Sequence, residues 1–170
     1  RVYMSMAKYI ENSCKILGIE KGGREVSTPL SQPINTEDEK LNPAEVKEFL
    51  TATGMLGWLA QTVRCDVAYA YSRIAQHSAH PTQSAMDAVR RTFKYLQSTK
   101  DLTLSAEWNT GDLDIAEAFN RLTLEKNEWS FYTDSDHAGN AEPQNKRRSQ
   151  NGMMALLNGA PVSWASKATS

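Results

Sequence analysis

Residues 42–98 decide how the first half of the chain folds: NPAEVKEFLTATGMLGWLAQTVRCDVAYAYSRIAQHSAHPTQSAMDAVRRTFKYLQS. Asn42 supplies a helix cap, Pro43 stands at the first helical position and Glu45 places a carboxylate in the first turn. We therefore predict a helix that begins at Pro43. Its apolar face is expected to consist of Phe49, Met55, Leu56, Leu59 and Ala60.

Two more helices are predicted in the same stretch. Asp66 is placed to cap the second of the three. The His80-Pro81 step then breaks the pattern, and a third helix is predicted from about Thr82 to Ser98. Three consecutive helices indicate a helical subdomain. The residues expected on the buried face of the third helix are Met86, Val89, Phe93 and Leu96.

Shorter elements are predicted on either side of the helices. Residues 2–5 favour a short strand, and apolar residues at helical spacing predict a helix that ends at Gly18. Residues 20–42 are rich in Gly, Pro, Ser, Thr and charge, so we expect a long surface connection there. Alternating apolar residues between 102 and 106 predict another strand.

The apolar period changes to two after Glu128, which indicates strands in the last part of the chain. The first of them, WSFYTD, ends in carboxylates. Asn158-Gly159 separates two further apolar runs and predicts a hairpin, because both central positions of a type I′ turn need a positive φ. The fold class predicted from these patterns is α+β.

Composition limits the possible functions. The chain has 170 residues, with 19 Lys plus Arg against 20 Asp plus Glu, so any contact with nucleic acid must come from local clusters of charge. Cys14 and Cys65 form no CxxC pair, which argues against zinc and favours a reducing compartment. No apolar run approaches the roughly 20 residues that span a bilayer. We expect an intracellular protein of the cytoplasm or nucleus, without membrane contact.

Residues 54–99 resemble the segment that follows the polymerase active site in copia-type retrotransposons. That family carries a "G-x-L-x-Y-L-A … T-R-P-D-I-x-Y-A" block, followed by "P-T … A-x-R-x-L-R-Y-L-x-x-T". Cys65 replaces the usual proline, and Val63 the usual threonine. The matching residues are Gly54, Leu56, Leu59, Ala60, Arg64, Asp66, Tyr69, Ala70, Pro81, Ala88, Arg91, Tyr95, Leu96 and Thr99.

A second block, residues 131–167, resembles the opening of the ribonuclease H domain in the same family, "Y-x-D-A-D-W-A-G … R-R-S-T-S-G-Y … L-G-G-x-P-I-S-W-x-S-K". His137 stands for the usual Trp, and Met153 for the usual Tyr. The matching residues are Asp134, Asp136, Ala138, Gly139, Arg147, Arg148, Ser149, Gly152, Pro161, Ser163, Trp164, Ser166 and Lys167.

The resemblance implies an internal fragment of a copia-type Pol polyprotein. We expect that both ends of the chain are places where a longer polyprotein sequence was cut. Residues 1–107 would be the mainly helical C-terminal part of the reverse transcriptase, thumb- or connection-like, and 108–127 a linker. Residues 128–170 would be the first antiparallel strands of a truncated ribonuclease H-like domain. The intact parent would copy RNA into DNA and degrade the RNA of RNA/DNA hybrids. The sequence lacks the Y-x-D-D polymerase motif, so the fragment alone is expected to be inactive.

Asp134 matches the first metal-binding carboxylate of the family's nuclease domain. The resemblance therefore implies a catalytic role for Asp134 with Mg²⁺ in the intact parent. Asp136 lies on the same strand face and is a second candidate metal ligand. Without the resemblance, an acidic pair at the end of a strand is more often part of a solvated turn than a metal site. His137 is a candidate general acid or base, although a histidine in a surface loop is the commoner case.

Two basic clusters are candidate contacts for phosphate groups, because Arg and Lys attract a nucleic-acid backbone regardless of its sequence. In the parent their partners would be the template–primer duplex and the RNA/DNA hybrid, beside the remainder of the polyprotein. The alternative for the helical cluster is the solvated face of an amphipathic helix. The first cluster is Arg90, Arg91 and Lys94, and the second is Lys146, Arg147 and Arg148.

Two other functions stay open from the sequence. The segment could be a non-catalytic module that a host has kept for binding nucleic acid or protein. It could also be a decayed relic with no present function. The nucleotide sequence on either side separates these alternatives, because an enzyme needs an open frame with the missing carboxylates.

Overall fold

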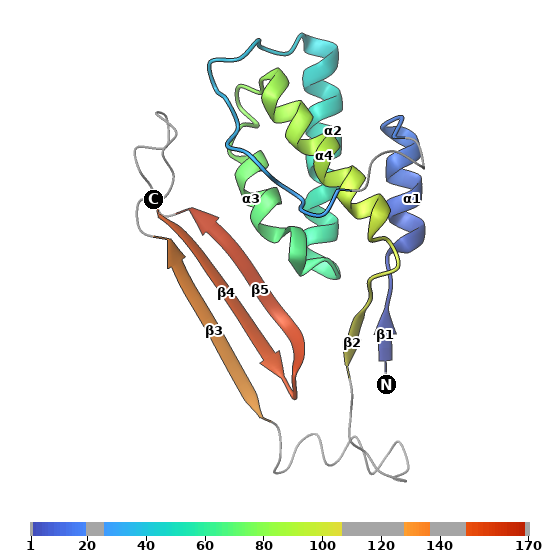
Figure 1. Ribbon diagram of the computed structural model, residues 1–170, viewed down its shortest axis with the longest axis vertical. Helices are drawn as coiled ribbons and strands as arrows, with labels where there is room; N and C mark the ends of the chain where they lie inside the picture. The colour runs from blue at the N-terminus through green and yellow to red at the C-terminus, as the bar shows by residue number, and fades with distance from the viewer. Residues whose placement is uncertain (1, 20–25, 107–127, 137–148, 169–170) are drawn as a thin grey trace.

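The computed structural model describes residues 2–19, 26–106, 128–136 and 149–168. It is a mixed α+β fold, as predicted, in which a block of helices lies beside a separate sheet (Figure 1). None of the helices in these ranges combines the length and apolar character needed to cross a bilayer. The elements are β1 (Val2–Met4), α1 (Ala7–Ile16), α2 (Pro43–Thr62), η1 (Cys65–Val67), α3 (Ala68–Ala75), α4 (Gln83–Ser98), β2 (Leu104–Ala106), β3 (Trp129–Asp136), β4 (Gln150–Leu157) and β5 (Ala160–Ala168).

The start of α2 confirms the predicted cap. The Asn42 side chain accepts hydrogen bonds from the backbone N–H groups of Ala44 and Glu45, at 3.0 and 3.1 Å. The Glu45 carboxylate in turn accepts from the backbone N–H of Asn42 at 2.8 Å. This reciprocal arrangement satisfies N–H groups that have no partner within a helix, so the sequence fixes where α2 begins.

The predicted cap of the second helix is wrong. The chain first makes the 3₁₀ turn η1, and α3 then begins after Val67 without a side-chain cap. The Asp66 carboxylate is instead occupied by the side chains of Arg64 and Tyr95. The guanidinium of Arg64, two residues earlier, and the Tyr95 phenol from α4 have replaced the backbone N–H groups of a helix start as its donors.

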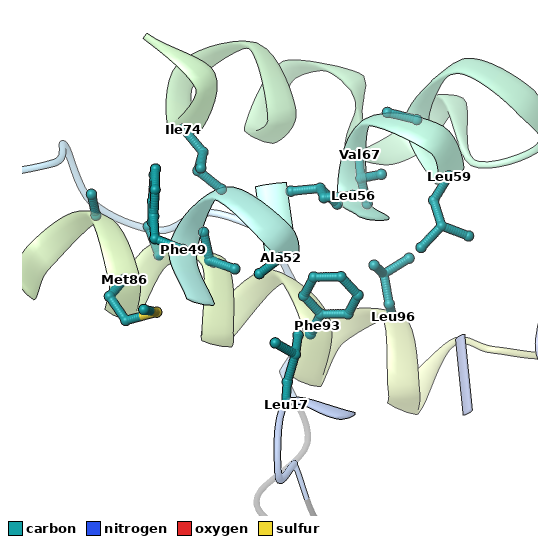
Figure 2. Close-up of a cluster of buried hydrophobic side chains, with 14 of the residues drawn as sticks. Leu17, Phe49, Ala52, Leu56, Leu59, Val67, Ile74, Met86, Phe93 and Leu96 are labelled. Atoms are coloured by element: carbon teal, nitrogen blue, oxygen red, sulfur yellow. The ribbon is translucent and has the colours of Figure 1, made fainter. Parts of the chain in front are cut away.

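The third predicted helix is confirmed as α4. Thr82 caps it by accepting a hydrogen bond from the backbone N–H of Ala85 at 3.4 Å. Its four predicted core residues are all buried. They pack against α1 and α2 in one apolar cluster, part of which is shown in Figure 2. The completely buried members of that cluster include Ile10, Phe49, Leu56, Leu59, Val89, Phe93 and Leu96.

The last part of the chain forms an antiparallel sheet in the order β3-β4-β5. Asn158 and Gly159 join β4 to β5 with φ values of 51° and 78°, which confirms the predicted hairpin turn. The strands β1 and β2 form a second, two-stranded antiparallel ribbon, and both had been expected from the sequence. The bends and turns of residues 26–42 agree with the predicted surface connection.

Two glycine substitutions should change stability in opposite directions. Gly159→Ala is expected to lower the free energy of unfolding by about 1 kcal/mol, because alanine is strained at positive φ. Gly54→Ala should raise it by about 0.5–1 kcal/mol, because Gly54 lies inside α2 with no atom in the way of a new methyl group. Urea unfolding of both variants measures this contrast. A change in the free energy of unfolding that has the same sign and size in both variants would contradict the prediction.

Strand β5 of this sheet contacts α3, the helix nearest the sheet (Figure 1), and it also contacts β2. The indole N–H of Trp164 on β5 donates to the backbone carbonyl of Ala60 on α2. On β4, the Gln150 amide nitrogen donates to the hydroxyl oxygen of Ser72 on α3 at 3.0 Å. These contacts hold one face of the sheet toward the helices.

Candidate functional site

The two candidate carboxylates lie at the end of β3. Asp134 pairs in register with Gly152 of β4, and Asp136 pairs with Gln150. Because side chains alternate along a strand, Asp134 and Asp136 share one face of the sheet, as predicted. Gly152 has no side chain, so the position directly across from Asp134 on β4 carries none on that face.

That face of the sheet forms one wall of a groove of about 560 Å³, which we call the carboxylate groove. Its other wall comes from η1 and the start of α3. Asp134 and Asp136 are the charged groups among its described lining residues, so the groove is negative. The lining residues are Cys65, Ala68, Tyr69, Tyr132, Thr133, Asp134, Asp136, Gln150, Gly152, Met153, Met154, Trp164, Ala165 and Ser166.

The carboxylate of Asp134 has ample capacity for further ligands. One oxygen accepts a hydrogen bond from the backbone N–H of Ser135 at 2.9 Å, in an exposed setting. The Ser135 hydroxyl is itself engaged with the Asn151 side chain at 2.8 Å. Because a carboxylate offers about four acceptor sites, Asp134 can also take a metal ion or a cationic donor.

The donor set suits a hard divalent cation in part. Mg²⁺ prefers oxygen ligands, and proteins often hold it with one or two carboxylates while water completes the shell. Asp134 and Asp136 supply such a pair. Within the described residues, however, no group of three or more His, Cys, Asp or Glu side chains comes together. The pair therefore fits as part of a magnesium site.

The basic residues of α4 do not gather at this groove. In Figure 1, α4 lies apart from β3, with α3 nearer the sheet. Arg90 is exposed and forms an ion pair with Glu48 at 3.1 Å. The Arg91 guanidinium donates to the hydroxyl of Thr28 at 3.2 Å, and Lys94 is exposed. None of these three residues lines the carboxylate groove.

The remaining predicted site residues lie outside the described part of the chain. They are His137, Lys146, Arg147 and Arg148.

Sequence reasoning missed a charged cluster between the ends of α2 and α4. The Arg64 side chain is only 2% exposed, and its guanidinium forms two hydrogen bonds with the Asp66 carboxylate, at 2.9 and 2.7 Å. It also donates to the backbone carbonyl and the hydroxyl of Thr99. The Tyr95 hydroxyl donates to Asp66 at 2.8 Å, and the Tyr95 ring lies 5.7 Å from the Arg64 guanidinium carbon.

This Arg64 cluster shifts the acidity of Asp66. Burial raises the pKa of the Asp66 carboxyl, but the hydrogen bonds and charge of Arg64, with the Tyr95 hydroxyl, outweigh burial and hold that pKa below its ordinary value of 3.8. All four residues appear in the motif that resembles the family, so the signal was present in the sequence. Their mutual contact was not visible there.

The similarity of the chain to retrotransposon Pol polyproteins supports a transposon-related origin, and an effector protein is also among its relatives. The chain is 33% identical over 119 residues to "Secreted RxLR effector protein 161" of Plasmopara viticola. The aligned region is 70% of this chain and 71% of the effector protein. It is 29% identical over 143 residues to "Retrovirus-related Pol polyprotein from transposon RE2" of Arabidopsis thaliana, 84% of this chain and 8% of the polyprotein. The corresponding polyprotein from transposon RE1 is 30% identical over 120 residues, 71% of this chain and 7% of the polyprotein.

The matched share of these relatives differs greatly. The chain corresponds to most of the effector protein but to less than a tenth of either Pol polyprotein. No protein-family model and no solved structure matches the chain.

Proposed function

Because this chain belongs to the family of the Plasmopara viticola effector protein and is similar to retrotransposon Pol polyproteins, we propose that it is a segment of a copia-type Pol polyprotein. In this proposal, residues 1–107 are the C-terminal part of a reverse transcriptase, and residues 128–170 open a ribonuclease H-like domain. The intact parent copies RNA into DNA, degrades the RNA of the hybrid and works inside the cell.

The observation that carries this proposal is the position of Asp134. It stands near the end of an antiparallel strand, faces an open groove and lies in a segment with the family's nuclease motif. The similarity to a Pol polyprotein over 84% of the chain supports placing the helical block and the sheet in one parent protein.

Asp134 and Asp136 would hold Mg²⁺ in the parent through their carboxylate oxygens. When bound, the ion positions a water molecule against the RNA phosphodiester and stabilises the leaving oxygen. The role of β3 is to fix the direction of both carboxylates, and Gly152 leaves the approach to Asp134 open. The two carboxylates are also negative, so the parent needs basic groups nearby to draw phosphates to this edge.

The basic residues of α4 are proposed to bind nucleic acid at a place separate from the carboxylate groove. Arg90, Arg91 and Lys94 lie on one helix, where they would contact the backbone of the template–primer duplex. Arg90 would exchange its exposed ion pair with Glu48 for a phosphate, which costs little because exposed pairs contribute only about 0–1 kcal/mol. Lys146, Arg147 and Arg148 remain proposed contacts for the hybrid.

The 170-residue segment alone should neither extend a primer nor cleave an RNA/DNA hybrid. The reason is that the sequence has no Y-x-D-D motif, and two carboxylates are too few for the two-metal chemistry of the nuclease. Primer-extension and hybrid-cleavage assays with purified, nuclease-free protein and Mg²⁺ measure this. Metal-dependent cleavage that Asp134→Asn abolishes would prove the prediction wrong.

A second candidate function is an independent, non-catalytic binding module. It is favoured by one observation: the chain corresponds to 71% of the effector-named relative, so a related protein exists that is not a whole polyprotein. The genomic sequence around this segment discriminates between the two. An open frame with Y-x-D-D upstream and acidic residues downstream supports the polyprotein, whereas an intact short gene supports the module and frameshifts indicate a relic.

A further inference from the structure

The outer face of the β3–β5 sheet, which lies opposite the carboxylate groove, carries two exposed aromatic rings. Because side chains alternate along a strand, Trp129 and Phe131 lie on the other side of β3 from Asp134. Trp129 is 53% exposed and Phe131 is 70% exposed. Their ring centroids are 5.9 Å apart and the ring planes differ by 10°, so the rings stack on each other at the surface. Single exposed apolar residues are ordinary, but a gathered pair of this size indicates a binding surface.

The sheet register brings one more apolar residue and a lysine onto the outer face. Met153 pairs with Thr133 and is 47% exposed. Lys167 pairs with Asn151 and is exposed. Strand spacing and rise place Lys167 about 16 Å from Phe131, with Met153 between them on the diagonal of the sheet. The described residues of this face include no acidic side chain, so the face is aromatic at one end and positive at the other.

Area and charge decide which partner fits the outer face. The three-stranded sheet has a footprint of roughly 400 Å², half of the ~800 Å² that each protein usually buries in a stable complex. A folded protein, including a second copy of this chain, therefore finds too little area. An acidic peptide would pair with Lys167 but leave the rings unused. A nucleic-acid strand with unpaired bases offers a flat π-face to the rings and a phosphate to the lysine, which is the combination that proteins use to hold single strands.

We propose that the outer face of the β3–β5 sheet binds single-stranded nucleic acid. One base extends the stack of Trp129 and Phe131, the next base lies over Met153, and a following phosphate pairs with Lys167. The bases of a duplex are paired and stacked on one another, so a duplex does not offer them to the rings. This binding needs no metal ion and no strand cleavage, and it uses the face of the sheet that the carboxylates do not occupy. It therefore goes beyond the function proposed above.

The test is a fluorescence-anisotropy titration of a short labelled oligodeoxythymidylate with the 170-residue chain. Trp129→Ala and Phe131→Ala should each weaken binding by about tenfold or more, because each variant removes a stacking surface. Phe131→Tyr keeps the ring and should bind like the unmodified chain. Lys167→Gln should reduce the steepness of the fall of log affinity with log salt concentration by about 0.7, the value for one phosphate contact to a single strand.

Two matched control variants should bind the strand like the unmodified chain. Trp58→Ala removes a tryptophan of α2 that is 56% exposed, and Lys8→Gln removes an exposed lysine of α1. Thermal unfolding of each variant checks that the fold is retained. An equal loss of binding in Phe131→Ala and Trp58→Ala would overturn the proposal. So would a loss in Phe131→Ala that is as large for the duplex of the same oligonucleotide.

Sedimentation of the chain without nucleic acid tests for a second copy on the same face. We expect a monomer, and a dimer that Phe131→Ala dissociates would overturn the proposal in favour of self-association. Hybrid cleavage by the parent is a separate measurement that depends on Asp134, so failure of strand binding leaves that function standing.

Discussion

Replacing Asp134 with Asn in the complete polyprotein should abolish cleavage of RNA in a hybrid while DNA synthesis continues. Asparagine keeps the size of the side chain but removes the charge that would hold Mg²⁺. Loss of a group that only orients a metal ligand costs about 10–100-fold, so loss of the ligand itself should lower the cleavage rate by roughly a hundredfold or more. The measurement is hybrid cleavage and primer extension on the same preparation.

Two further variants sharpen this experiment. Glu128→Gln removes an exposed carboxyl group just before β3 and should leave both activities intact. Asp136→Asn should reduce cleavage less than Asp134→Asn, because Asp136 lies two residues, or about 7 Å, further along the same face. Hybrid cleavage that survives Asp134→Asn at its full rate would refute the metal role of Asp134.

The elements that sequence reasoning predicted well are those with local signals. The Asn42 cap, the Thr82–Ser98 helix and the Asn158-Gly159 turn each depend on residues within a few positions of one another. Backbone geometry sets the spacing of these signals, so they can be recognised without knowledge of the tertiary fold.

The candidate site was predictable only in part, because it combines distant segments. The alternation along β3 was enough to place Asp134 and Asp136 on one face. The opposite wall, with Tyr69, comes from α3, and no local pattern indicates that α3 lies across from β3. Gln150 is likewise held against α3 by a hydrogen bond to Ser72, which is 78 residues away in sequence, and no local pattern predicts that contact.

Asp66 shows why a local signal can fail. An aspartate before a helix normally accepts hydrogen bonds from the first backbone N–H groups. Here Arg64 and Tyr95 offer it a charged donor and a hydroxyl, and Tyr95 is 29 residues away. Hydrogen bonds between charged groups are stronger than neutral ones, so the Arg64 guanidinium, with help from the distant Tyr95 hydroxyl, replaces the cap.

The Asp66→Asn variant should lower the free energy of unfolding by about 3 kcal/mol, because it leaves the buried Arg64 charge without its counter-ion. Arg64→Met should cost less, about 2 kcal/mol, because the Asp66 side chain is 31% exposed and water can solvate its carboxylate. Arg90→Met is the matched control. It breaks an exposed ion pair and should change stability by less than about 0.5 kcal/mol.

The pH dependence of these variants separates the ion pair from simple packing. The pKa of Asp66 is lower in the folded protein than its ordinary value of 3.8, so its contribution to stability is complete above that value. It is lost as the pH falls through the lower pKa of the folded state, because Asp66 then binds a proton. The difference between the unmodified chain and Asp66→Asn should therefore shrink in urea unfolding at acidic pH. A difference that stays constant from neutral pH down to strongly acidic pH would show that Asp66 acts through its shape and not its charge.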